Sequence, residues 1–473
     1  MISSIKIKGF RGFVEEQELK LSIPNGKRGS GLTVMVGPNN GGKSTVIESF
    51  RAICSKSDRS FMEGKRNKKA GDRVEIVLFH DDGKEECLKT VSNGGSEAKY
   101  DRKTVTNPHP SIYILPSRRY FNPFFNKSAG GREAFILSSS TLQYRGQPID
   151  DFKDRLFNAI REKDKFNRLL SRVIGKKLDW TIDQDNTGNY YVKIILNDGY
   201  HDSDGLGEGL VSLLFLIDSL FESSKNELIV IDEPELSLHP QLQRNLLDEI
   251  LDYSKDIQIL YATHSPEMVS IKAILNGGTL CRIVNEGNGS KIYQLNDVGR
   301  DCLKKFEGNL YNPHVLGYDA RSCFFEADRL VVVEGQEDVM FLNKALDDLH
   351  IEKRIRFFGF GAGGAGNIEY IATILKSLGF ENICCLYDGD KESELEKTKE
   401  LFPQYEFKLL DADDIRDKEC DIRNKCRNIK DEDECRICKH RKAGIFNKDN
   451  DIKPEFKTGF ECLLHEIAEK YGY

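Results

Sequence analysis

The stretch from Gly37 to Thr45 has the composition of a loop that binds phosphate groups. It follows the apolar run 32–36, and a helix should begin at Ser44, which is the context that such a loop requires. Glycine backbone N–H groups can turn toward phosphate oxygens, Lys43 supplies a positive charge, and Ser44 offers a hydroxyl to Mg²⁺. The residues expected to bind ATP here are Gly37, Asn39, Asn40, Gly41, Gly42, Lys43, Ser44 and Thr45.

A buried strand that ends in carboxylates is the second half of such a site. The apolar run 228–231 leads directly into Asp232 and Glu233. We expect Asp232 to hold Mg²⁺ through water and Glu233 to polarise the attacking water. His264 follows the apolar stretch 260–262, at a strand end where its imidazole could contact the γ-phosphate. Together these residues predict a site for ATP hydrolysis.

The motifs of this half resemble those of the RecF/SMC-like ABC ATPases. The resemblance rests on the phosphate-binding loop, GFRGF at 9–13, DEPELSLHP at 232–240 and the histidine downstream. It implies a P-loop head that dimerises around ATP, so that a single chain would hydrolyse ATP poorly. It also implies that Ser203 and Gly205, which precede a helix near Gly209, face a γ-phosphate on the second protomer. Their segment, SDGLG, departs from the commoner LSGGQ form.

Acidic residues mark a second candidate centre nearer the C-terminus. Glu334 and Asp388 each follow an apolar run, and Asp338 and Asp390 lie close behind them. Because open α/β sheets bind ligands at the carboxyl ends of their strands, we expect these four carboxylates to bind metal together. Oxygen ligands with no nearby histidine favour Mg²⁺ or Mn²⁺ over zinc. One or two such ions could activate water against a phosphodiester, which predicts hydrolysis of a nucleic-acid backbone.

The pattern EGxxD at 334–338, followed by DxD at 388–390, resembles the Toprim fold of topoisomerases, primases and some nucleases. This resemblance covers about residues 326–412. An ABC head followed by Toprim in one chain resembles the overcoming-lysogenization-defect (OLD) family of nucleases. It implies an endonuclease with Glu334, Asp338, Asp388 and Asp390 as metal ligands, and in many members a part in defence against phage.

The OLD resemblance also implies a further acidic residue and a basic residue toward the C-terminus. Asp414 is the acidic candidate, and the basic candidates are Lys439, Lys442 and Lys448. The compact chain is also similar to effector nucleases encoded beside retron reverse transcriptases. That similarity implies a reverse transcriptase and its RNA–DNA product as partners, besides the DNA substrate.

Cys420, Cys426, Cys435 and Cys438 stand in a segment too polar to form a core of its own. A structural zinc would explain how such a segment becomes ordered, with His440 as a rival ligand, and ordinary reduced thiols are the alternative. The segment around Arg118 and Arg119 also allows two interpretations. Their neighbouring aromatic residues either stack on bases or pack inside the protein.

The sequence predicts an α/β fold with two domains. An ABC-type (RecF/SMC-like) P-loop ATPase head is expected over residues 1–325, with a helical insertion at about 145–180 that could carry a dimer contact. A C-terminal Toprim, Rossmann-like domain is expected over 326–473, with the cysteine-bearing segment at about 411–473.

Composition and charge narrow the class of protein. A net charge of −7 argues against a protein that coats nucleic acid with its whole surface. The N-terminus lacks a signal-peptide layout, and polar residues interrupt the longest apolar stretch, 210–221, so we expect a cytoplasmic protein with no membrane partner. The leading hypothesis is an enzyme, a homodimer or homotetramer whose ATP-bound heads control access of DNA to paired Toprim sites. The alternatives are a non-catalytic RecF/SMC-like DNA-repair ATPase, whose Toprim unit only binds nucleic acid, and a topoisomerase or primase.

Overall fold

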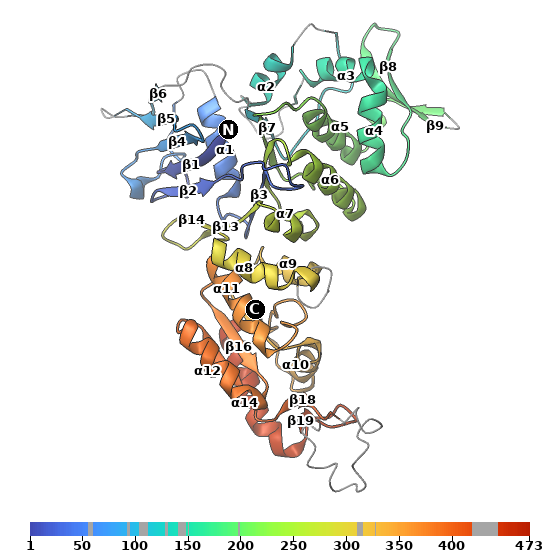
Figure 1. The fold of residues 1–473 in the computed structure, drawn as a ribbon. Coiled ribbons are helices and arrows are strands. Elements are labelled where there is room, and N and C mark those ends of the chain that lie inside the picture. Colours follow the sequence, from blue (N-terminus) through green and yellow to red (C-terminus); the bar gives the residue numbers. More distant parts are fainter. Residues whose placement is uncertain are drawn as a thin grey trace. The chain divides into compact units, whose positions relative to one another are not determined.

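The computed structural model shows two compact units, Met1–Gln294 and Leu295–Tyr473 (Figure 1). The described residues are 1–54, 60–91, 95–103, 112–127, 131–140, 148–149, 151–196, 199–309, 316–326, 328–418 and 443–473. The division falls ahead of the 325/326 boundary expected from the sequence. The reason is that helix α8 (Asp297–Lys305) packs against α11 (Ala365–Ser377) within the second unit.

A six-stranded, mainly parallel sheet forms the centre of the N-terminal unit. Its strand order is β14-β13-β3-β12-β11-β7, with an antiparallel pair, β13 and β14, at one edge. The bounds are β3 (Leu32–Val36), β7 (Ile112–Leu115), β11 (Leu228–Asp232), β12 (Gln258–Ala262), β13 (Thr279–Asn285) and β14 (Ser290–Gln294). Every residue of β3, β7, β11 and β12 is buried, as expected for parallel strands covered on both faces.

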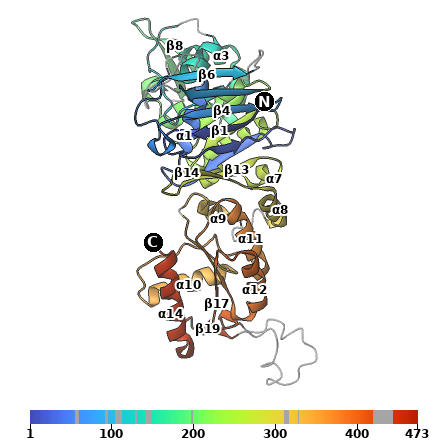
Figure 2. The same ribbon diagram turned by 90° about the vertical axis from the view of Figure 1, so that its left-hand side faces the viewer.

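An antiparallel sheet, in the order β2-β1-β4-β5-β6, packs beside the parallel one (Figure 2). The bounds are β1 (Ile2–Lys8), β2 (Gln17–Lys20), β4 (Glu75–His80), β5 (Glu85–Thr90) and β6 (Ala98–Lys103). Helix α1 (Lys43–Cys54) joins the two sheets, because its Phe50 shares one core with Ile5 of β1 and Val230 of β11. The helix expected after the glycine loop is confirmed.

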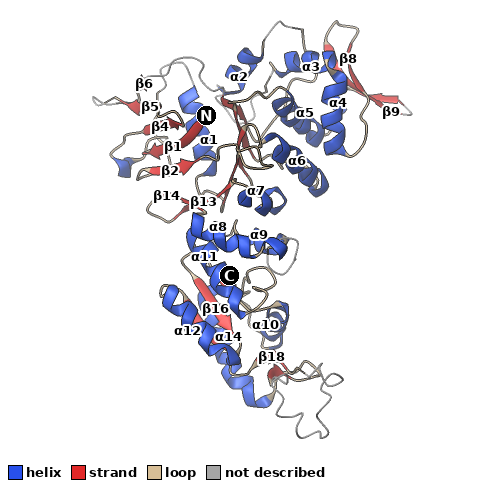
Figure 3. Ribbon diagram, viewed as in Figure 1, coloured by secondary structure: helices blue, strands red, loops and turns tan. Residues whose placement is uncertain are grey.

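Helices and a small sheet complete the N-terminal unit (Figure 3). They are α2 (Arg132–Ser140), α3 (Phe152–Arg161), α4 (Lys163–Ile174), α5 (Glu208–Phe221), α6 (Pro240–Tyr253), α7 (Ile271–Leu275) and the sheet β8 (Trp180–Gln184), β9 (Tyr190–Leu196) and β10 (Gly199–His201). The helical character expected at about 145–180 is confirmed by α3 and α4. Phe152 of α3 stacks on Phe215 of α5, with ring centroids 3.7 Å apart, so this insertion packs on the core.

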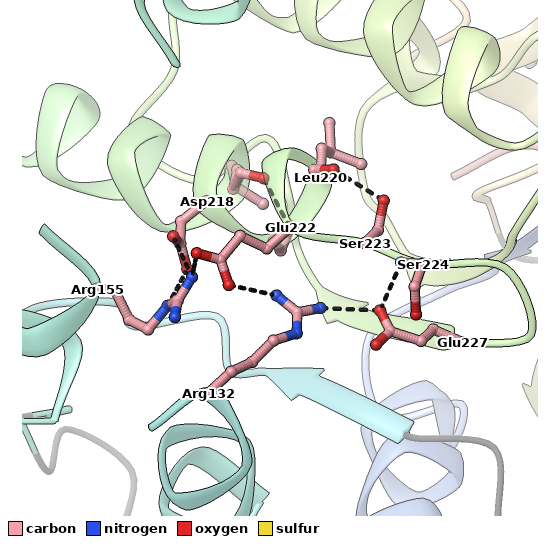
Figure 4. A network of polar contacts seen from close by, with 10 residues as sticks. Arg132, Arg155, Asp218, Leu220, Glu222, Ser223, Ser224 and Glu227 are labelled. Carbon is pink, nitrogen blue, oxygen red and sulfur yellow. Dashed lines mark hydrogen bonds and ion pairs between the residues drawn. The ribbon is translucent and has the colours of Figure 1, made fainter. Parts of the chain in front are cut away.

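A buried ion-pair network fixes the C-terminal end of α5 (Figure 4). Arg155 of α3 lies 3.3 Å from a carboxylate oxygen of Asp218 and also pairs with Glu222. Arg132 bridges Glu222 and Glu227, with its closer contact, to Glu227, at 2.8 Å. Burial raises the pKa of Asp218 to about 6, against the opposing effect of Arg155. The Asp218 carboxylate is therefore tolerated here because a guanidinium faces it.

Arg155→Met should lower the free energy of unfolding by about 3–5 kcal/mol at neutral pH, since it leaves a buried carboxylate unpaired. The loss should shrink in acid. The pKa of Asp218 already lies above its ordinary value, and it rises further without Arg155, so protonation removes the uncompensated charge as the pH falls. Denaturant titrations of both proteins near about pH 5 and about pH 8 measure this difference. An equal loss of unfolding free energy at both pH values would contradict the assignment of Asp218 as the carboxylate left unpaired.

The C-terminal unit is built on a parallel sheet in the order β15-β16-β17. Its strands are β15 (Leu330–Val332), β16 (Ile383–Tyr387) and β17 (Glu406–Leu409), and a second parallel pair is β18 (Asp414–Arg416) with β19 (Gly444–Phe446). The described α-helices besides α8 and α11 are α9 (Tyr318–Cys323), α10 (Gln336–Asp348), α12 (Glu392–Leu401) and α14 (Pro454–Tyr471). The strands expected to precede Glu334 and Asp388 are thus confirmed.

Cys420, Cys426, Cys435 and Cys438 lie outside the described residues, as do His440, Lys439 and Lys442. The eight cysteines within the described ranges are free thiols. None of the helices that the structure describes has the length and apolar character needed to cross a membrane.

Candidate functional site

The glycine loop, the end of β11 and the segment after β12 surround one cavity of about 490 Å³. They meet because β3, β12 and β11 are adjacent parallel strands, whose carboxyl ends share one edge of the sheet. The lining comprises Arg11, Asn39, Asn40, Gly41, Gly42, Lys43, Ser44, Thr45, Asp232, Glu233, Ala262 and His264. The structure thus gathers most residues predicted to bind or hydrolyse ATP, and it adds Arg11, which the sequence reasoning used only as part of a motif.

Lys43 is held at the base of this cavity by loop carbonyls. Its ammonium donates to the backbone oxygens of Gly37 at 2.7 Å and Pro38 at 3.0 Å. Burial lowers the pKa of Lys43 to about 8, although the nearby charges of Asp232 and Glu233 oppose that shift. Phosphate groups entering the cavity would favour the charged ammonium. Binding phosphate through that charge is the role expected of Lys43.

Two loop glycines approach strand β13 too closely for any side chain. A Cβ atom at Gly41 would lie 2.2 Å from the carbonyl oxygen of Ile283, and one at Gly37 would lie 2.3 Å from the same atom. Gly37 also has a φ of +129°, a conformation that favours glycine. The glycines therefore let the loop lie directly against β13.

Gly41→Ala should lower ATP affinity by about tenfold or more and lower the melting temperature, because the β13 backbone is paired on both sides and cannot yield. Titration with a fluorescent ATP analogue and thermal unfolding measure both effects. Gly366→Ala is the matched control, since a Cβ there meets nothing within 4 Å and the residue lies in α11. Equal ATP affinity in Gly41→Ala and the control would show that the clash is relieved without cost.

The turn after β11 is held in a left-handed conformation. Glu233 has a φ of +48°, which costs a non-glycine residue about 1–2 kcal/mol, and its N–H donates to Ala262 of β12 at 2.9 Å. Arg119 donates to the carbonyl oxygens of Asp232 at 2.9 Å and Glu233 at 3.0 Å. Arg119 therefore packs inside the protein, whereas Arg118 is exposed. The sequence signal for the buried place of Arg119 is its position just past β7, the strand beside β11.

His264 lies at the same cavity and is positioned by Glu235. The Glu235 carboxylate accepts the backbone N–H of His264 at 2.6 Å, and burial raises the pKa of Glu235. Burial and the charge of Lys43 lower the pKa of His264. Its imidazole is therefore neutral at physiological pH and suited to a hydrogen bond with a γ-phosphate. The motif DEPELSLHP contained Glu235, but its spacing did not reveal this contact.

Ser203 and Gly205 lie away from the glycine loop, in the turn before α5. The Ser203 hydroxyl accepts the N–H of Val192 at 2.6 Å, and the side chain of Asp202 accepts the N–H of Gly205 at 3.1 Å. Ser203 lines a second cavity of about 740 Å³, whose walls also include Arg118, Arg119 and Ser212. Within one chain these residues are thus separate from the ATP cavity, so contact with a nucleotide would need a second copy or a rearrangement.

The acidic residues of the C-terminal unit are placed by strand ends and a helix start. A carboxylate oxygen of Glu334 accepts the backbone N–H of Asp388 at 2.9 Å, which ties the end of β15 to the end of β16. Asp338, in the first turn of α10, accepts the N–H of Gly335 at 2.7 Å. Burial is the main cause that raises the pKa of Asp338 to about 7, and the negative charges of Glu334 and Asp414 add to the shift.

Asp414 joins this group from β18, where it is buried and pairs with Lys418 at 2.6 Å. Lys418 also contacts Glu337 at 3.5 Å, and the pKa of Lys418 is raised by Asp414, Glu337 and Asp388 against the effect of burial. The structure thus brings Asp414 to the acidic group and adds Lys418, a cation that the sequence reasoning missed. Lys418 lies two residues past the end of β18, and Asp390 lies three residues past the end of β16.

The acidic group has the donor chemistry of a divalent-metal site. Among the described residues, no three His, Cys, Asp or Glu side chains are already drawn together around a metal position, and Asp390 pairs with Lys391 at 3.0 Å. Carboxylates are nevertheless crowded, because Asp338, Asp388 and Asp414 are buried and Asp338 feels the charges of two others. A bound Mg²⁺ or Mn²⁺ would relieve that repulsion, so the residues fit such an ion.

Comparisons with known proteins find similar family models, sequences and structures. Two family models match: an AAA ATPase domain over residues 1–164, and an AAA domain described as a putative AbiEii toxin of a type IV TA system over 95–270. Endonuclease GajA of Bacillus cereus is 22% identical over 452 residues, covering 80% of this chain and 74% of its own. An SMC head bound to the C-winged helix domain of ScpA matches with a TM-score of 0.42 and 14% identity, over 63% of this chain and 98% of its own.

The fold is α/β, and the N-terminal unit contains an ATPase domain. The OLD nuclease of Thermus scotoductus is 30% identical to this chain over 447 residues, which cover 80% of each protein. This chain therefore belongs to the OLD family of nucleases.

Proposed function

We propose that this protein is an ATP-hydrolysing, divalent-metal-dependent DNA endonuclease of the OLD type that acts in antiphage defence. The observation that carries the nuclease assignment is the acidic group, in which Glu334, Asp388 and Asp414 come from the ends or starts of three strands. The names of the relatives, OLD nuclease and endonuclease GajA, support the same activity. The C-terminal unit would then be a Toprim domain.

Glu334, Asp338, Asp388 and Asp414 are the residues that would hold one or two Mg²⁺ or Mn²⁺ ions, with Asp390 at the edge of the group. The ions would supply the activation of water and the neutralisation of charge on the leaving oxygen. Lys418 carries a positive charge beside Asp414, where it can contact a DNA phosphate. The loop before α11 helps to hold the Glu334 backbone in place, since the N–H of Gly364 donates to the carbonyl oxygen of Glu334 at 2.8 Å.

The ATPase head would act as the switch of the nuclease. Lys43, Ser44, Asp232, Glu233 and His264 bind and hydrolyse ATP in this proposal, and the turn at Ser203 and Gly205 faces the nucleotide of a second copy. A homodimer or homotetramer through the heads follows from that arrangement. Sedimentation with and without ATP measures the change in assembly.

Cleavage of supercoiled, linear duplex and single-stranded DNA by the purified protein, with Mg²⁺ or Mn²⁺ and with or without ATP, tests the proposal. Cutting that requires the metal and disappears in the Glu334→Ala, Asp390→Ala double variant would support it. ATP hydrolysis without cutting on any DNA would instead favour the non-catalytic DNA-repair ATPase. The retron-linked partner, a reverse transcriptase with its RNA–DNA product, stays a prediction that co-purification from the native operon tests.

A further inference from the structure

Arg119 connects the turn that contains Glu233 to α5, the helix that follows the Ser203 turn. Its side chain is 5% exposed and uses all three guanidinium nitrogens. They donate to Ser212 Oγ at 3.0 Å, to the Pro116 carbonyl at 2.7 Å, and to the carbonyls of Asp232 and Glu233 at 2.9 and 3.0 Å. A single rigid, planar group therefore joins α5 to the backbone that carries Glu233.

The two ends of this connection belong to different parts of the ATPase. Glu233 lines the cavity that contains the glycine loop of the same chain. Ser212 lies in the first half of α5, and with Ser203 it lines the second cavity, which lacks the glycine loop. A ligand that shifts the start of α5 would displace Ser212, and the Arg119 guanidinium would transmit that displacement to the Glu233 turn.

The Glu233 turn needs such a support. Glu233 adopts a φ of +48°, which an L-residue keeps only when its surroundings impose it. The turn is held by the N–H bond from Glu233 to Ala262, by the bond from the Leu236 N–H to the Glu233 carbonyl, and by the two carbonyl bonds from Arg119. Burial lowers the pKa of Arg119 to about 10, still above physiological pH, so the guanidinium stays charged and donates at every nitrogen.

We propose that Arg119 is a positioning residue for ATP hydrolysis, which sets the orientation of Glu233 and couples it to the position of α5. The role rests on the proposed ATPase function. It predicts that Arg119 affects turnover much more than nucleotide binding, because its hydrogen bonds go to Ser212, Pro116 and the β11 turn and not to the phosphate-binding loop between β3 and α1.

Arg155 supplies a matched control on the same helix. It is also a buried arginine bound to α5, but it contacts Asp218 and Glu222 at the C-terminal end of that helix (Figure 4). A structural loss of α5 packing should therefore appear in Arg155→Met as well. A loss of the Glu233 orientation should appear in Arg119 variants alone.

The experiment measures kcat and KM for ATP hydrolysis, fluorescent ATP-analogue binding and thermal unfolding in the full chain. Arg119→Met should lower kcat by about tenfold or more, with KM and analogue affinity within about threefold of wild type. Arg119→Lys should recover part of kcat, since one ammonium can satisfy some of the acceptors. Arg155→Met should lower the melting temperature and leave kcat per folded molecule unchanged.

Ser212→Ala keeps the test decisive if Arg119→Met does not fold, because it removes only the α5 end of the connection. It should lower kcat less than Arg119→Met and leave KM unchanged. An unchanged kcat in Arg119→Lys and Ser212→Ala, or an equal kcat loss in Arg155→Met, would overturn the positioning role. A wild type that binds ATP without hydrolysing it would overturn the proposed ATPase function together with this role, so the two failures are distinguishable.

Discussion

Glu233→Gln is expected to lower kcat of ATP hydrolysis by about 100-fold or more while leaving ATP binding intact. The amide keeps the size of the side chain and the backbone contacts of the turn, but it loses the basic oxygen that would polarise water. Lys43 and the glycine loop, which would hold the phosphates, are untouched. Steady-state hydrolysis and binding of a fluorescent ATP analogue measure the two quantities separately.

The same variant should accumulate the ATP-bound assembly, because bound ATP is no longer consumed. Sedimentation with ATP should show more dimer or tetramer in Glu233→Gln than in wild type. Glu267→Gln is the matched control, since Glu267 pairs with an exposed arginine, Arg244, outside the cavity lining. Hydrolysis at the wild-type rate in Glu233→Gln would assign water activation to another group, and His264 would be the next residue to change.

The positions of the candidate residues on strand ends could be predicted because that signal is local. An apolar run that stops at a carboxylate or a glycine loop reports a buried strand and its end, as β11 and β16 show. Strands that run in parallel then place their ends on one edge of a sheet. Asp232, His264 and the loop after β3 were therefore predicted to lie together before any contact was known.

Contacts between distant segments were not predictable in the same way. Arg119 lies 113 positions from Asp232 in the chain, and its sequence neighbours, a proline and aromatic residues, suit a loop or a nucleic-acid surface equally well. Asp414 and Lys418 depend on where β18 lies against α10, which spacing alone does not fix. A residue pattern gives the chemical groups of a site, whereas packing decides which of them face one another.

The turn before α5 shows that a residue type suited to phosphate binding does not fix which contact the residue makes. Ser203 and Gly205 have the right types for a phosphate contact, but folding gives their hydroxyl and N–H other partners, Val192 and Asp202. Both bonds lie within one chain, in a small sheet and the turn that follows it. Residue type thus shows what a group is able to bind, and the structure shows which contacts must be exchanged first.

Glu334→Gln should lower the rate of metal-dependent DNA cutting by about 100-fold or more, while the rate of ATP hydrolysis stays near the wild-type value. The substituted side chain keeps a carbonyl oxygen that can accept the Asp388 N–H, so the tie between β15 and β16 survives. The negative charge that would hold a divalent cation is lost. Nicking of supercoiled plasmid and phosphate release from ATP, measured on the same preparation, separate the two activities.

A folding defect and a metal-binding defect differ in how the melting temperature responds to Mn²⁺. A ligand that binds the folded state raises the melting temperature, so wild type should gain stability with Mn²⁺ and Glu334→Gln should gain little. Without metal, the variant should be at least as stable as wild type, because it removes one charge from a crowded acidic group that already raises the pKa of Asp338. Asp348→Asn, on the exposed end of α10, is the control and should match wild type in cutting and in the Mn²⁺ response. Cutting retained by Glu334→Gln would remove the acidic group from catalysis and leave it a structural or DNA-binding role.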